Sequence, residues 1–221
     1  IDFTVHQGET IAVVGATGAA KSTLMHLVPR LYDVTEGEVC INGRNVKEYP
    51  LKILQHAIGM VLQTNELFTG TILENLRWGK PDATQEEVEE ATKAAEAHDF
   101  ILSFTDGYQT ILGRGGVNVS GGQKQRICIA RALLLKPKIL ILDDSTSAVD
   151  TETEKKIRHN MRALLKDTTV FVVTQRLHTM QAADRVLVLD DGEIEAIGTS
   201  SELMEKSAIF KEIYHSQQMF F

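Results

Sequence analysis

The segment TIAVVGATGAAKST, residues 10–23, joins an apolar run, a glycine-containing loop and the start of a helix in one continuous stretch. Thr10–Val14 is short, apolar and followed by Gly15, as expected of a buried strand. After the loop, apolar residues between Leu24 and Leu31 recur at the spacing of one helical face. A strand, a loop and a helix in this order predict the first unit of an α/β fold.

The rest of the chain repeats this alternation of strands and helices. The expected strands are Ile58–Leu62, Ile139–Leu142 and Val170–Val173, and the expected helices include Ser120–Leu135 and Thr151–Lys166. An entirely apolar strand such as Ile139–Leu142 is typical of a sheet covered on both faces. The alternation therefore predicts a largely parallel sheet, with ligands at the carboxyl ends of its strands.

Shorter patterns predict antiparallel elements and a helical insertion. Asn42-Gly43 is a strong tight-turn signal, so a small antiparallel β subdomain is expected around it. Arg185–Leu189 and Glu193–Ile197 flank Asp-Asp-Gly and predict a hairpin, and a capping-box pattern at Thr199 begins a closing helix. In the middle of the chain, helical patterns follow one another without an intervening strand and indicate a helical insertion. They are Thr71–Arg77, Gln85–Ala97 and Asp99–Phe104.

Composition excludes several classes of function. The net charge of -7 opposes nonspecific attraction to nucleic acid. No stretch reaches the roughly 18 apolar residues of a membrane-spanning helix, and no signal segment opens the chain. Cys40 and Cys128 have no partner at a metal-ligand spacing, which favours a reduced, cytoplasmic setting. Because Ile1–Val5 already alternates like a strand, we expect the chain to be a piece of a longer protein.

The loop after the first strand resembles the P-loop of nucleotide-binding proteins. In that motif, backbone N–H groups cradle phosphates, a lysine reaches the terminal phosphates and a hydroxyl binds Mg²⁺. The strict pattern has glycine where this chain has Ala20, whose Cβ limits φ and crowds a close phosphate. The candidate nucleotide-binding residues are Gly15, Ala16, Thr17, Gly18, Ala19, Ala20, Lys21, Ser22 and Thr23.

A second motif, Ser120-Gly121-Gly122-Gln123 at the start of a helix, resembles the signature motif of ABC proteins. Backbone N–H groups at a helix start form an anion site suited to a γ-phosphate. The alternative interpretation is an N-cap followed by flexible glycines.

The resemblance covers nearly the whole chain, because further motifs of the family follow in order. Gln63 falls at the Q-loop, Ile139–Asp143 looks like the Walker B strand, and Ser147–Asp150 resembles the D-loop. Thr110–Val119 is similar to the X-loop of exporters, although Arg114 stands where an acidic residue is usual.

The resemblance implies a P-loop NTPase (RecA-like) core with a mostly parallel sheet, a small antiparallel β subdomain and an inserted α-helical subdomain. The core would comprise about 1–62 and 136–221, and the helical subdomain 63–135, with no membrane domain in this chain. ATP and Mg²⁺ are the implied cofactors, with Ser22, Gln63 and Asp143 at the metal. The implied location is the cytoplasmic face of the cell membrane.

Two catalytic positions depart from the active family pattern. Asp144 replaces the glutamate that polarises the attacking water, and Gln175 replaces the switch histidine. Aspartate is one methylene shorter, and glutamine lacks a protonatable imidazole. The chain therefore resembles the degenerate subunit of heterodimeric ABC exporters. The implied partners are a non-identical nucleotide-binding domain, whose site Ser120–Gln123 completes, and a transmembrane domain.

Three other classes of protein share these motifs. A regulatory module that holds ATP and turns it over slowly fits Asp144 and Gln175. A DNA-repair or chromosome-organising ATPase is disfavoured, because Gln63 and Ser120 are too close in sequence to admit a long coiled coil. An importer subunit is disfavoured by the exporter-like segment before the signature.

Overall fold

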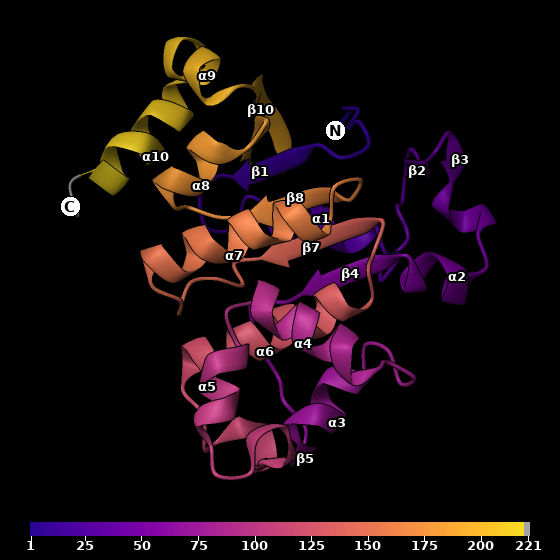
Figure 1. The fold of residues 1–221 in the computed structure, drawn as a ribbon. Helices are drawn as coiled ribbons and strands as arrows, with labels where there is room; N and C mark the ends of the chain where they lie inside the picture. Colours follow the sequence, from indigo (N-terminus) through magenta and orange to yellow (C-terminus); the bar gives the residue numbers. More distant parts are fainter. Residues whose placement is uncertain (219–221) are drawn as a thin grey trace. The chain divides into compact units, whose positions relative to one another are not determined.

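A computed structural model describes residues 1–218, which form two compact units (Figure 1). The first unit contains Ile1–Ile58, Ile139–Asp143 and the chain from Thr168 onward. The second unit contains Gly59–Lys138 and Asp144–Asp167. Among residues 1–218, no helix combines the length and the apolar character needed to cross a bilayer.

The central sheet has the strand order β10-β9-β1-β8-β7-β4. In this sheet, β1 pairs in parallel with β8 and β9, β7 pairs in parallel with β8, and β10 is antiparallel to its neighbour β9. The bounds are Thr10–Val14 (β1), Ile139–Asp143 (β7), Thr169–Val173 (β8), Arg185–Asp190 (β9) and Glu193–Gly198 (β10). β4, Ile58–Val61, begins in the first unit and continues in the second. The predicted α/β fold with a mostly parallel sheet is confirmed.

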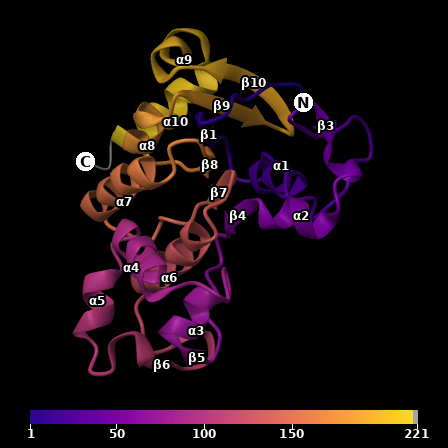
Figure 2. The same cartoon turned by 45° about the vertical axis from the view of Figure 1, so that its right-hand side comes forward.

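The core of the first unit explains why β1 is central. Ile11, Ala12, Val13 and Val14 are completely buried, as a strand paired on both edges and covered on both faces requires. Side chains of β1 and β9 pack against α8, α9 and α10, which lie beside the β9–β10 hairpin (Figure 2). The helices are α1 (Lys21–Leu27), η1 (Val46–Glu48), α2 (Leu51–His56), α8 (Leu177–Ala182), α9 (Ser200–Lys206) and α10 (Ala208–Gln218).

Turn chemistry sets the small antiparallel elements of the first unit. Asn42 and Gly43 both have positive φ, 53° and 73°, and join β2 (Cys40–Ile41) to β3 (Arg44–Asn45) as predicted. Thr199 and Glu202 form the predicted capping box at the start of α9. The prediction of one apolar face from Leu24 to Leu31 is wrong, because α1 ends at Leu27, its buried side chain is Met25, and Leu31 is exposed.

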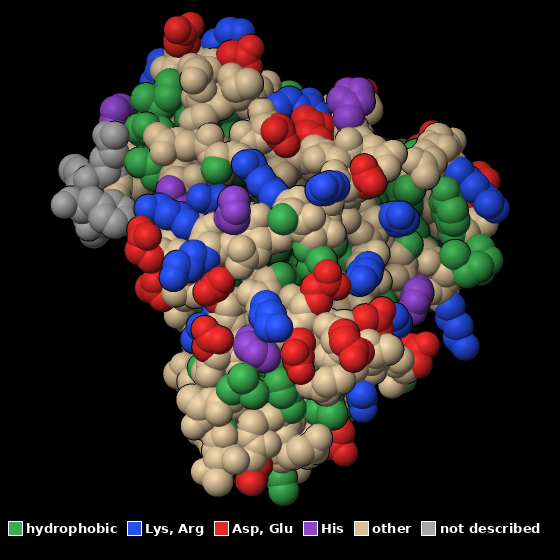
Figure 3. Space-filling view, viewed as in Figure 1, with side chains coloured by type: hydrophobic (Ala, Val, Ile, Leu, Met, Phe, Trp, Pro, Cys, Tyr) green, Lys and Arg blue, Asp and Glu red, His purple; other side chains and the backbone are tan. Residues whose placement is uncertain are grey.

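The second unit is mainly helical. α4 and α6 pack side by side, and α3 also packs on α6 (Figure 1). Acidic side chains gather over α4, which carries Glu86, Glu87, Glu89 and Glu90 (Figure 3). The elements are β5 (Gly70–Thr71), α3 (Ile72–Arg77), α4 (Gln85–Ala94), α5 (His98–Ser103), η2 (Gly107–Gln109), β6 (Ile111–Leu112), η3 (Arg114–Gly116), α6 (Gly121–Leu134) and α7 (Thr151–Leu164).

An ion pair beside β1 predicts how stability depends on pH. Arg185 donates to Glu9, with 2.9 Å between Nη2 and Oε2, and this bond holds the pKa of Glu9 below its ordinary value. A depressed folded-state pKa stabilises the fold above the unfolded carboxyl pKa of about 4.3, and the contribution is lost as pH falls through the folded value. Glu9→Gln should therefore lower the free energy of unfolding at pH 7 by on the order of 0.5–1 kcal/mol.

Urea unfolding of both proteins between pH 7 and pH 3 measures this difference, with the exposed Glu36→Gln as the matched control. The difference between Glu9→Gln and the parent should shrink below about pH 4. A difference that is constant across this range would show that the ion pair does not contribute.

Candidate nucleotide-binding site

The loop after β1 begins at a glycine that the structure requires. A Cβ on Gly15 would lie 2.2 Å from the Leu189 carbonyl oxygen, which is too close for any residue with a side chain. Gly18 has φ +87° but open space around it, so its requirement is conformational. Ala16, Thr17 and Gly18 are exposed. The loop therefore presents its backbone to solvent at the carboxyl end of β1, where a phosphate can approach it.

Ala20 adopts the conformation that the missing glycine would favour. It is the N-cap of α1, with φ 65° and ψ 19°, in the left-handed region. Its carbonyl oxygen accepts the first bond of the helix, from Leu24 N at 2.9 Å. The methyl group of Ala20 therefore costs backbone strain at this one residue.

The charged and hydroxyl groups after the loop face the end of β7. Lys21 Nζ donates to the carbonyl oxygens of Gly15 at 2.9 Å and Ala16 at 2.7 Å, so its ammonium lies on the loop itself. Ser22 Oγ donates to Asp143 Oδ1 at 3.0 Å. Asp143 is only 4% exposed and ends β7. A hydroxyl and a carboxylate oxygen held together in this way fit the oxygen ligation that Mg²⁺ prefers.

Gln175 lies at the same edge of the sheet. The register pairs Val173 of β8 with both Val13 and Asp143, so the three strands end together. Beyond β8, the buried Thr174 Oγ1 accepts from Arg176 N at 3.0 Å and forms a tight turn. Gln175 is exposed at this turn. The structure thus brings the loop, Asp143 and Gln175 to one edge of the first unit.

In the second unit, Ser120 and Gln123 cap α6 reciprocally. Ser120 Oγ accepts from Gln123 N at 3.2 Å, and Gln123 Oε1 accepts from Ser120 N at 2.9 Å. These two residues of the motif therefore have a structural role as a capping box. The N-cap expected as the alternative to an anion site is present, and Ser120 and Gly121 remain exposed beside it.

The glycines of this motif lie against Ser147–Asp150, here called the D-loop. A Cβ on Gly122 would come within 2.8 Å of the Ala148 carbonyl oxygen, and one on Gly121 would lie 3.6 Å from Ala148 Cβ. Asp150 Oδ1 accepts from Thr153 N at 2.9 Å and caps α7. Gly122 therefore permits an approach that any larger residue would block.

Gln63 and Asp144 belong to the second unit, whereas the loop, Asp143 and Gln175 belong to the first. Gln63 is exposed after β4, and its carbonyl oxygen accepts from Asn65 Nδ2 at 3.4 Å. Asp144 is half-buried with φ 46°, an uncommon conformation for a residue other than glycine. Backbone strain of this kind is frequent at functional positions.

One residue near the motif was missed by the sequence reasoning. Gln125 is 3% exposed, and its side chain binds both Ser147 and Ala148. The available signal was its helical spacing, because Gln125 lies three and four residues before the buried Cys128 and Ile129 and so shares their face of α6.

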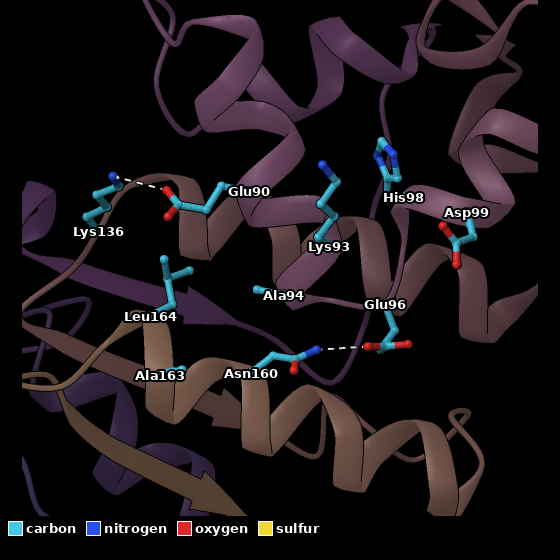
Figure 4. Close-up of a pocket in the computed structure, with 10 residues that line it drawn as sticks. All are labelled: Glu90, Lys93, Ala94, Glu96, His98, Asp99, Lys136, Asn160, Ala163 and Leu164. Atoms are coloured by element: carbon cyan, nitrogen blue, oxygen red, sulfur yellow. Dashed lines mark hydrogen bonds and ion pairs between the residues drawn. The ribbon is translucent and has the colours of Figure 1, made fainter.

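A cavity of about 700 Å³ in the second unit lies apart from these candidates. Its lining comes from α4, α5, α7 and nearby turns, with Asn160 Nδ2 donating to Glu96 Oε1 at 2.8 Å and Lys136 paired with Glu90 at 3.3 Å (Figure 4). None of the residues that line it is a predicted site residue. The candidate nucleotide site is an exposed strand edge rather than this cavity.

Known proteins resemble the chain along almost its whole length. The family model described as ABC transporter matches residues 1–147. The chain is 49% identical over 219 residues to YgaD of Bacillus subtilis (strain 168), named as a candidate multidrug export ATP-binding/permease protein. It is 46% identical over 219 residues to a Staphylococcus aureus (strain NCTC 8325 / PS 47) protein of the same description. These matches cover 99% of the chain but only 38% of each relative.

A solved structure of a bacterial Atm1-family ABC exporter with ATP bound has a TM-score of 0.92 and 38% identity to this chain. That match covers 96% of the chain and 37% of the exporter chain. The chain therefore belongs to the ABC transporter family, as an ATP-binding domain related to multidrug export ATP-binding/permease proteins.

The strain at Ala20 predicts a stabilising substitution. Ala20→Gly removes the Cβ at φ 65° and should raise the free energy of unfolding by about 1 kcal/mol. Ala19→Gly is the matched control, because Ala19 is 4% exposed and should instead destabilise the fold through loss of a buried methyl group. Urea unfolding measures both, and a loss of stability in Ala20→Gly would show that the alanine is unstrained.

Proposed function

We propose that this chain binds and hydrolyses ATP to power export across a membrane through nucleotide-driven dimerisation. The observation that carries the proposal is the Ser22 Oγ–Asp143 Oδ1 bond of 3.0 Å, beside a loop on which Lys21 lies. This bond joins a hydroxyl of the P-loop motif to a carboxylate of the Walker B motif at the carboxyl ends of the strands. The names of the relatives support export as the process.

The proposed cofactors are ATP and Mg²⁺. The loop residues Gly15–Thr23 would hold the phosphates through backbone N–H groups, with Lys21 on the terminal phosphates. Ser22, Asp143 and Gln63 would hold Mg²⁺, which when bound neutralises charge on the phosphates. In this assignment, 1–62 and 136–221 form the catalytic core, and 63–135 form the helical subdomain.

We infer that the chain's own hydrolytic site is weakened. Asp144 offers a carboxylate one methylene shorter than glutamate, and a displacement of about 1 Å can cost roughly 10²-fold in rate. Gln175 is exposed at the strand edge and can donate to phosphate, but it cannot exchange a proton as imidazole does. Ala20 adds strain to the loop that holds the phosphates.

The signature motif, by contrast, keeps the features of an anion site. Ser120 and Gly121 are exposed, and the capping box sets the first turn of α6. The proposed partner is a second, non-identical nucleotide-binding domain whose ATP this motif contacts. A transmembrane domain of the same transporter completes the assembly, with this domain at the cytoplasmic face.

The second candidate function is a regulatory module that holds ATP and turns it over slowly. The left-handed Ala20 and the residues Asp144 and Gln175 favour it. Single-turnover hydrolysis by the isolated domain and by an assembled pair separates the two functions. A regulatory module should hydrolyse ATP at the same slow rate alone and in the pair, whereas a transport ATPase should hydrolyse ATP faster in the assembled pair.

The proposed roles of Ser120 and Asp144 predict which of two substitutions lowers ATPase activity more. Ser120→Arg in an assembled pair should lower steady-state ATPase activity by on the order of 10²–10³-fold, because bulk and charge replace an oriented donor set. Asp144→Asn should have a milder effect, since that site is already slow. Both are measured in one membrane preparation, with ATP occlusion as the control for assembly. If Asp144→Asn were the more damaging change, this chain's own site would be the working one.

A further inference from the structure

The side chain of Gln125 spans two successive residues of the D-loop. Its Oε1 accepts from Ala148 N at 2.9 Å, and its Nε2 donates to Ser147 Oγ at 3.2 Å. A backbone N–H can only donate, so the amide oxygen must face Ala148 and the NH₂ group must face Ser147. Both ends of this 3% exposed amide are therefore used, and its orientation is determined by its partners.

The same D-loop residue lies close to the glycines of the signature. A Cβ on Gly122 would come within 2.8 Å of the Ala148 carbonyl oxygen, and a Cβ on Gly121 would lie 3.6 Å from Ala148 Cβ. Gln125 therefore binds the N–H of Ala148, and the carbonyl group of the same residue lies close to Gly122 at the start of α6.

Gln125 differs in solvent exposure from the residues that it contacts. Ser120, Gly121, Ser147 and Ala148 are exposed, whereas Gln125 is buried behind them. Within the D-loop, Val149 N donates to Thr146 O at 3.0 Å, and Ser147 N donates to Asp144 O at 3.4 Å.

We propose that Gln125 is a positioning residue that joins the D-loop to the signature helix, so that Ser120, Gly121, Ser147 and Ala148 form one preset surface toward a bound phosphate. This inference rests on the proposed function, because it assigns a purpose to the surface that the signature offers. Gln125 does not touch the phosphate in this account. It acts through the placement of Ala148 and Ser147.

The two hydrogen bonds of Gln125 determine which substitutions test its role. Methionine has nearly the same length and is unbranched, but it replaces both amide groups with weakly polar atoms. Glutamate keeps an oxygen that can accept from Ala148 N. Gln125→Met therefore tests the bonds at nearly constant volume, and Gln125→Glu tests partial rescue.

A disulfide measures the geometry without any nucleotide. Because a Cβ on Gly121 would lie 3.6 Å from Ala148 Cβ, Gly121→Cys with Ala148→Cys falls in the Cβ separation that disulfides adopt, about 3.5–4.5 Å. Cys40 is exposed and is replaced by serine in every variant. Oxidation of this chain should close the bridge readily. Adding Gln125→Met should slow formation of the disulfide by on the order of 10-fold, because a displaced D-loop moves the two Cβ atoms out of the narrow range of separations that a disulfide allows.

The matched control is Gln85→Met in the same double-cysteine background. Gln85 is an exposed glutamine of α4 whose Nε2 donates to Glu89 Oε1 at 3.0 Å, so its substitution should leave the closure rate unchanged. Equal closure rates in the Gln125→Met and Gln85→Met proteins would overturn the proposal.

Activity is then measured in the assembled transporter with native cysteines. Gln125→Met should lower kcat by on the order of 10-fold with KM for ATP unchanged, since the nucleotide loop is elsewhere, and Gln125→Glu should recover part of the loss. A rise in KM with kcat intact, or no change in either, would overturn the proposal. Failure of the proposed function is distinguishable, because it would leave Ser120→Arg active while the closure rates still responded to Gln125→Met.

Discussion

The parallel pairing of β1 on both edges is the constraint on which the first unit depends. β8 and β9 fix its register, and the buried run Ile11–Val14 leaves it no freedom to shift. Gly15 must then follow at the carboxyl edge, under the Leu189 carbonyl, and the loop turns outward into α1. Because β7 and β8 end at the same level, Asp143 meets Ser22 there. The proposed phosphate site at this edge would be a consequence of strand order and register.

Local signals in the sequence predict much of this fold. Apolar runs identified β1 and β7, the Asn42-Gly43 pair identified a hairpin, and Thr199 identified a helix start, because each depends on neighbouring residues alone. The pairing of Gly70–Thr71 with Ile111–Leu112 was not predicted, since short segments far apart in sequence carry no periodic signal. Motif spacing likewise located Ser22 and Asp143, whereas the two bonds of Gln125 depend on tertiary contact.

The two candidate motifs differ in how their sequences relate to structure. The loop of the first unit departs from its usual pattern at Ala20, yet its backbone takes the left-handed course that glycine would take there. The signature keeps its pattern, and three of its four residues have an identifiable structural reason: Ser120 and Gln123 cap the helix, and Gly122 admits the Ala148 carbonyl. A site can thus lose optimal chemistry while its scaffold persists. In the proposed function, this contrast supports slow turnover at the first motif and contact with a partner's nucleotide at the second.

The most direct test of this account is isothermal titration of the chain with ATP, with and without Mg²⁺. We expect saturable binding that strengthens with Mg²⁺ and that is strongly weakened by Lys21→Ala. In Ser22→Ala the binding should no longer depend on Mg²⁺, since the Ser22 hydroxyl and Asp143 are proposed to hold the cation together. Binding that is absent at millimolar ATP, or that is equally strong in the parent and in Lys21→Ala, would contradict it.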